Sequence, residues 1–346
     1  MKSSAALSDP ARLALSLGAA VVAIIAISAG LFALGNADPF VAFRAMYRGS
    51  FGSWVSFGET LIRFAPVSLI ALGLVPSLRI GLFNIGAPGQ IGLGALFATL
   101  AGFALGGAPP AVSIPVTFVA AAAGGALWAL GPGLLRAYFR VNEILSTLVF
   151  NFLALYLLQY LLTGPLHGHR SNIAQSDPLP KEAWLPVVIE GTRAHAGLFV
   201  VLAAIVGLWL VQRSPLGYRL RLFGAGPDLA RQAGVSGKRL IVWTMCVGGA
   251  AAGIAGWMQV AGVDHRLYDT VAGPIGYMGL FAALLGVLHP VGIFFSGLVF
   301  AALLRGGESL QIGANISPEI ISALVGLILL LLAARSGRFT RASREA

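Results

Sequence analysis

The chain alternates between long apolar runs and short stretches that are polar or rich in glycine and proline. A helix needs about 20 apolar residues to cross the roughly 30 Å hydrocarbon core of a bilayer, so these runs predict membrane-spanning helices. The predicted spans are residues 13–34, 61–78, 82–105, 111–135, 144–162, 196–211, 240–262, 275–288, 291–304 and 320–334. The predicted fold class is therefore all-α, a polytopic membrane protein with eight to ten transmembrane helices.

Two of these runs are shorter than a comfortable crossing. Residues 275–288 and 291–304 hold 14 residues each, and His289 and Pro290 lie between them. Proline breaks a helix, and backbone groups released at membrane depth must be buried in protein or face water. We predict a pair of tilted or re-entrant helices here, which leaves both eight and ten crossings open.

The first run, residues 13–34, follows basic residues and precedes small ones, a pattern that a cleavable signal peptide shares. The apolar core of a signal peptide spans roughly 7 to 15 residues. This run has 22 residues, so we favour a retained helix.

Composition also favours a lipid environment. Hydrophobic residues make up 57% of the 346 residues and charged residues only 10%, with a mean hydropathy of +0.85, whereas soluble domains carry about 25% charged residues. So few charges cannot cover a surface in water. We predict one transmembrane domain over residues 1–346, with a cytoplasmic tail at 1–12, a helical bundle at 13–334 and a basic cytoplasmic tail at 335–346.

The net charge of +10 comes from Lys and Arg residues placed between the apolar runs, which argues against nucleic acid as a partner. Fifteen of the 23 basic residues fall on the side that holds both termini. Cytoplasmic segments of membrane proteins carry such an excess. Both termini are therefore predicted to be cytoplasmic.

Two connecting segments are long enough to contact a partner. Residues 164–195 form an external loop that four prolines keep irregular, and either a partner site or a plain connection fits it. Residues 213–239 form a basic internal segment, in which Pro227 and Asp228 predict a helix start and Gly234 its end. A short cytoplasmic helix suits docking of a soluble partner, and a basic loop that only holds topology is the alternative.

Four segments together resemble a known family: residues 81–90 (GLFNIGAPGQ), 141–151 (VNEILSTLVFN), 224–235 (GAGPDLARQAGV) and 285–292 (LGVLHPVG). In order and spacing they are similar to the nucleoside branch of bacterial ABC-importer permeases, a branch related to the permeases for simple sugars and branched-chain amino acids. The resemblance covers roughly residues 59–334. The first 50 residues and the basic tail carry no recognisable motif.

The resemblance implies the larger of two paired permeases in an importer of the bacterial inner membrane. Its partners would be an ABC ATPase, a second homologous permease and an extracytoplasmic substrate-binding lipoprotein, with a nucleoside as solute and a simple sugar such as ribose as the alternative. The chain has no GxxxxGK[ST] motif, so the ATPase subunit would hydrolyse ATP and this chain would bind no cofactor. The implied ATPase-coupling residues are Pro227, Asp228, Leu229, Ala230, Arg231 and Gly234.

Polar residues within the runs are the candidates for the translocation pathway. Glycines and Pro88 between Asn84 and Gln90 disfavour a continuous helix, so backbone groups and amides there can face a cavity; a close helix crossing with bonded amides is the alternative. Glu143, Thr147 and Asn151 are spaced at i, i+4 and i+8 and so share one helix face. For Glu143, a role in gating or assembly is open beside a direct role in transport. The full candidate set is Asn84, Gln90, Glu143, Thr147, Asn151 and Gln259.

The sequence shows no catalytic constellation and no metal-ligand spacing among its five histidines and single cysteine, so we predict neither an enzyme nor a metal site. Glu59 and Arg63, at i and i+4, are predicted to pair. Gly249 and Gly253 predict a close helix crossing. A stand-alone secondary transporter, the other alternative, needs acidic residues at mid-span, and the sequence has almost none.

Overall fold

The computed structural model describes residues 26, 28–30, 32–33, 38–169 and 171–314. Its described part is helical apart from loops and two isolated β-bridges, which confirms the predicted all-α class. The chain forms two compact units, Trp54–Ala301 on the one hand and Met1–Ser53 with Ala302–Ala346 on the other.

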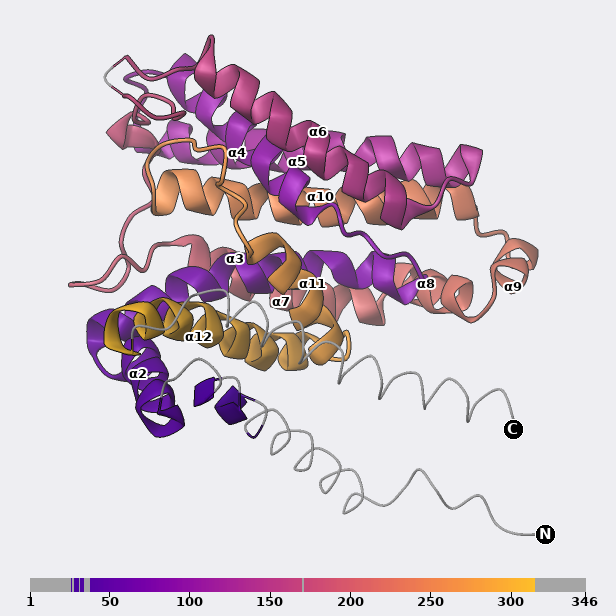
Figure 1. Cartoon of the computed structure of the whole chain (residues 1–346). Coiled ribbons are helices and arrows are strands. Elements are labelled where there is room, and N and C mark those ends of the chain that lie inside the picture. The colour runs from indigo at the N-terminus through magenta and orange to yellow at the C-terminus, as the bar shows by residue number, and fades with distance from the viewer. Residues whose placement is uncertain (1–25, 27, 31, 34–37, 170, 315–346) are drawn as a thin grey trace. The chain divides into compact units, whose positions relative to one another are not determined.

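The helices of the larger unit follow one another along the chain, and the longest connection is the one between α6 and α7 (Figure 1). They are α3 (Trp54–Arg79), α4 (Ala87–Ala104), α5 (Pro110–Phe139), α6 (Glu143–Thr163), α7 (Gly197–Arg213), α8 (Pro215–Ala225), α9 (Pro227–Gln232), α10 (Gly237–Gly262) and α11 (Ile275–Leu285). A single 3-10 turn, η1 (Lys181–Ala183), lies between α6 and α7. Helix α12 (Pro290–Ala314) begins in the larger unit and ends in the smaller one, which also holds α2 (Pro39–Phe51).

Six of the described helices are long and apolar enough to cross a membrane, namely α3, α4, α5, α6, α10 and α12. Helices α7 and α8 meet at an angle of 70°, and counting this bent pair as one span raises the number to seven within the described residues. The predicted span at 13–34 is described only at residues 26, 28–30 and 32–33, which are helical. The predicted span at 320–334 lies outside the described residues.

Among the differences between the predicted and observed helices, three concern the helix breaks and the basic segment. The sequence predicts helix over 82–105, but α4 begins only at Ala87, because the glycines before it disfavour a helix. It also predicts a 14-residue piece at 291–304, whereas α12 runs for 25 residues from Pro290. Finally, residues 215–225 form helix α8, which was not predicted from the sequence. Ser214 caps it by accepting a hydrogen bond from the amide of Gly217.

Helix α10 lies at the centre of the larger unit, with α3, α4 and α5 packed along it (Figure 1). Gly125 of α5 meets Gly249 and Gly253 of α10 so closely that an added Cβ on any of the three would overlap backbone of the other helix. Gly94 of α4 meets Gly253 in the same way. The crossing confirms the close packing predicted from the Gly249–Gly253 spacing, and in lipid such backbone contact replaces the hydrophobic effect as the force between helices.

Candidate functional site

The first element of the site is the break between α3 and α4. Gly81 has a φ of +78°, which glycine adopts without strain, and the chain then runs without helix to Gly86. Asn84 lies within this break and Gln90 in the first turn of α4, and both are buried. The Asn84 Nδ2 donates to Gln90 Oε1 at 3.2 Å, and Gln90 Nε2 donates to Asn84 Oδ1 at 3.0 Å. Asn84 Oδ1 also accepts the amide of Gly86 at 3.0 Å.

Helix α6 joins this cluster through Asn151. Its Oδ1 accepts the amide of Gly89 at 2.9 Å, and its Nδ2 donates to the carbonyl of Ile85 at 3.0 Å. In a continuous helix the Gly89 amide would donate to the Ile85 carbonyl, four residues earlier. The Asn151 side chain takes the place of this missing bond by bonding both groups. Four of the six predicted pathway residues therefore lie together, since Thr147, one turn from Asn151, also lies beside Gly86.

Glu143 lies one turn further along α6, where the helix begins. Asn142 caps this end by accepting the amides of Ile144 and Leu145 at 2.9 and 3.1 Å. The Glu143 carboxylate is buried and pairs with Arg136 of α5 at 3.2 Å, and its carbonyl accepts the Thr147 hydroxyl at 2.7 Å. The pair joins the end of α5 to the start of α6, a contact that the sequence analysis did not identify.

Gln259 does not lie in this cluster. It is buried on α10, eleven residues beyond Gly248, the α10 position that faces the Asn84 amide. At 1.5 Å per residue this separation is about 16 Å along the helix. Five of the six predicted residues therefore lie near one broken segment, and Gln259 lies towards the other end of α10.

A second break joins α11 to α12. Val287 and Leu288 both have positive φ values, 52° and 54°, in the left-handed region that β-branched residues such as valine rarely adopt. The carbonyl of Leu288 accepts Arg79 Nη2 of α3 at 3.3 Å and Gln212 Nε2 of α7 at 3.2 Å. Side chains from two other helices therefore hold this strained turn, which agrees with the predicted helix break before Pro290.

Glu59 is the centre of an ion cluster near the start of α3. Its predicted pairing with Arg63 is confirmed at 3.2 Å. The stronger partner is Arg193, whose Nε and Nη2 donate to the two carboxylate oxygens at 2.7 and 2.6 Å. Such bidentate geometry fixes orientation as well as charge, and it joins the long segment between α6 and α7 to α3.

That long segment, residues 164–195, is held against the connection between α10 and α11. Backbone amides of Ser176, Leu179 and Leu185 donate to the carbonyls of Leu267, His265 and Ala261 at 2.8 to 3.0 Å. Its four prolines do keep most of the segment irregular, as predicted, but its backbone is hydrogen-bonded along much of its length.

His195 ends the segment in a fully buried position. Its Nδ1 accepts the amide of Gly197 at 3.1 Å, and Gly262 of α10 lies against the ring. Burial, and after it the charge of His265, lowers the pKa of His195 to about 4. His265 stacks on Trp184 with 3.7 Å between ring centroids, and burial also lowers its pKa. The two imidazoles are therefore neutral at pH 7.

The predicted short helix in the basic segment is present as α9. Asp228 and Arg231 pair at 3.3 Å across its exposed side, Leu229 is 53% exposed, and Ala230 is fully buried. Gly234 ends the turn with a φ of +76°. Helices α8 and α9 lie at the end of the larger unit opposite to residues 164–195 (Figure 1).

Comparison with known proteins extends these observations. The family model described as "Branched-chain amino acid transport system / permease component" matches residues 56–333. A glucose ABC transporter permease of Haloferax volcanii is 35% identical in an alignment of 324 residues that covers 90% of this chain and 85% of the relative. A guanosine ABC transporter permease of Bacillus subtilis is 31% identical, over 93% of this chain and 91% of the relative.

A nucleoside ABC transporter permease of Lactococcus lactis is 26% identical over 86% of this chain and 84% of the relative. The solutes named for these relatives differ, so the comparisons support the predicted family without deciding between its nucleoside and sugar branches. Such a permease works with an ABC ATPase and a substrate-binding protein and is not an enzyme. The chain belongs to the branched-chain amino acid transport system permease family and is a multi-pass permease subunit of an ABC importer.

Proposed function

We propose that this permease carries nucleosides by alternating access, and that it forms the pore with a second, related permease. The buried amide cluster of Asn84, Gln90 and Asn151 at a broken helix carries the proposal. Neutral donors and acceptors match the hydroxyls and base edges of an uncharged nucleoside better than charged groups do. In this structure the amides bond one another, so solute passage would exchange those bonds for bonds to the solute.

Relatives support both parts of the proposal. Two permeases of Bacillus subtilis carry the name guanosine ABC transporter permease, and they are 31% and 27% identical to this chain. Two permeases of one name in one organism support a pore of two unlike chains. A sugar remains the second candidate solute, favoured by the 35% identity to a glucose permease.

Helix α9 is proposed as the contact with the ATPase, and both termini are proposed to be cytoplasmic. Its exposed Leu229 and the Asp228–Arg231 pair offer an apolar and polar surface of the kind that a soluble partner can bind. The excess of basic residues in 213–239 supports placing this end in the cytoplasm and residues 164–195 outside. Closing of the ATPase would then be transmitted through α9 and α8 to the bundle.

The test is uptake of labelled guanosine into proteoliposomes that contain this chain, its second permease, the ATPase and the binding protein. We expect ATP-dependent uptake that excess glucose or ribose does not inhibit. The double variant Asn84→Ala/Gln90→Ala should lower uptake, and Leu229→Glu should uncouple ATP hydrolysis from uptake. Leu229→Met, which keeps an apolar side chain at the same exposed position, serves as the matched control. Inhibition by a sugar would assign the sugar branch instead.

A further inference from the structure

The exposed face of α2 combines aromatic rings with arginines. Phe40, Arg44, Tyr47, Arg48 and Phe51 fall within an arc of about 100° on the helix, at spacings of three and four residues. Phe40 is 74% exposed and Tyr47 is 66% exposed. The opposite face is buried: Ser50 Oγ donates to the carbonyl of Ala302 of α12 at 2.8 Å, and Gly49 lies against Ser309.

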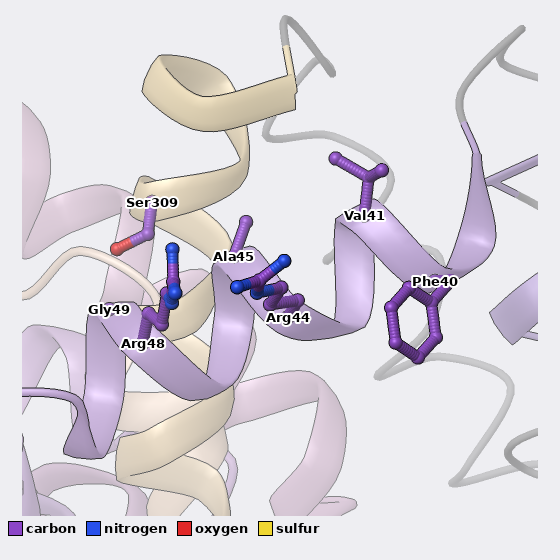
Figure 2. Close-up of a pocket in the computed structure, with 7 residues that line it drawn as sticks. All are labelled: Phe40, Val41, Arg44, Ala45, Arg48, Gly49 and Ser309. Atoms are coloured by element: carbon purple, nitrogen blue, oxygen red, sulfur yellow. The ribbon is translucent and has the colours of Figure 1, made fainter.

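A cavity of about 500 Å³ opens between this face and α12. Its lining consists of Phe40, Val41, Arg44, Ala45, Arg48, Gly49 and Ser309. Figure 2 shows the two arginine side chains one turn apart along α2, with Ser309 contributed by the neighbouring helix. Polar groups thus occupy one end of the cavity and apolar side chains the other.

Neither guanidinium has an ion pair or side-chain hydrogen bond with another described residue. The nearest carboxylate in sequence, that of Asp38, caps the helix by accepting the amide of Phe40 at 2.8 Å. Two positive charges at one cavity mouth therefore select an anion, and two forked guanidiniums suit the oxygens of a phosphate group.

The membrane environment indicates which phosphate-bearing molecule binds in the cavity. With 13 residues, or about 20 Å, α2 is too short to cross a bilayer. Exposed phenylalanine and tyrosine rings beside arginines are typical of helices that lie at the level of the lipid headgroups. We propose that this cavity binds an anionic phospholipid, with its phosphate between Arg44 and Arg48 and its acyl chain along Phe40 and Val41. The site is independent of the solute that the pore carries.

The test is lipid retention by the full-length chain, purified from membranes and examined by native mass spectrometry in the presence of phosphatidylglycerol or phosphatidylcholine. We expect phosphatidylglycerol to be retained selectively, and the double variant Arg44→Gln/Arg48→Gln to weaken its binding by about tenfold or more. Arg219→Gln/Arg239→Gln removes the same charge at two exposed positions of the basic segment and should retain the lipid.

A second variant separates the cavity from the charge. Ala45→Leu keeps both arginines but reduces the space, and it should also weaken retention, with gel filtration to confirm that each variant is folded. Equal retention of both lipids, or of phosphatidylglycerol by wild type and the Arg44/Arg48 variant, would overturn the proposal. Displacement of the lipid by millimolar inorganic phosphate would assign a site for the free anion instead, and a dimer formed through α2 in cross-linking would assign the face to a second copy of the chain.

Discussion

The side-chain amides of Asn84, in the break between α3 and α4, and Gln90, in the first turn of α4, donate hydrogen bonds to each other. Each amide satisfies the other in a place where water is excluded, so the pair holds the break without any charged group. Asn151 of α6 bonds the backbone of the same segment at Gly89 and Ile85, so a substitution at Asn151 tests what holds the break.

Replacing Asn151 with alanine should destabilise the protein by about 2 to 4 kcal/mol, because the Gly89 amide and the Ile85 carbonyl would each lose a buried partner. Thermal unfolding in detergent measures the effect. Leu153→Ala, at an exposed position of the same helix, is the control and should change stability little. An unchanged melting temperature in Asn151→Ala would show that water replaces the amide.

The Glu59 cluster should hold the segment between α6 and α7 in place. Glu59→Gln removes the charge that Arg193 and Arg63 share, and we expect opening of residues 186–196 to become easier by about 1 to 3 kcal/mol, a range reduced by the exposure of Arg193. Hydrogen exchange of the backbone amides reports this opening. Glu190→Gln removes an equal charge from an exposed site on the same segment, and a similar effect there would contradict the role of Glu59.

The burial of His195 predicts a dependence on pH. Unfolded histidine has a pKa near 6.5, while the folded pKa is about 4, so the unfolded state binds the proton first as pH falls. This difference in pKa corresponds to about 3 kcal/mol in the free energy of unfolding. That stability is fully present above pH 7 and is lost as the pH falls from about 6.5 towards 4. Hydrogen exchange of residues 185–197 between pH 7.5 and pH 4.5 should show this loss.

The same exchange experiment on His195→Gln should show a much weaker dependence on pH, because the variant has no group that titrates at that position. His289→Gln, which removes a histidine at the α11–α12 connection, is the control and should behave as the wild type does. A wild-type segment whose opening does not change over this range would contradict a buried neutral imidazole.

The glycine crossing predicts opposite effects of one substitution at two helix positions. Gly253→Ala places a Cβ against the Ala121 carbonyl and should cost about 1 to 3 kcal/mol in thermal unfolding. Gly207→Ala on α7 meets no atom within 4 Å and should be neutral or stabilising by up to about 1 kcal/mol, because alanine favours the helix. Equal effects at both positions would contradict backbone contact between α5 and α10.

Local sequence patterns predict the helices of the bundle and the break before α4, since both depend on neighbouring residues. The Glu59–Arg63 pair is predictable for the same reason. Arg193 lies 134 residues from Glu59, and no local pattern connects them. Asn84 and Gln90 are recognisable as candidates from sequence, but their mutual bonding depends on how the non-helical backbone before Ala87 turns into α4.

Helix α8 was missed for a different reason. Its arginines and glycines conceal the helical pattern, and the capping serine, Ser214, gives the only clear signal. The burial of His195 has no sequence signal at all, because the residue follows an exposed loop and is enclosed only when α10 packs beside it.

The shared glycines of α4, α5 and α10 also limit how the protein can change shape. Where backbones touch, no side chain can change rotamer to let one helix slide or turn against another, so these three helices should move as one rigid body. Conformational change would then be confined to the parts that pack around this block. Among them, the strained Val287–Leu288 turn and the amide-bonded segment before α4 are the joints that can exchange their partners.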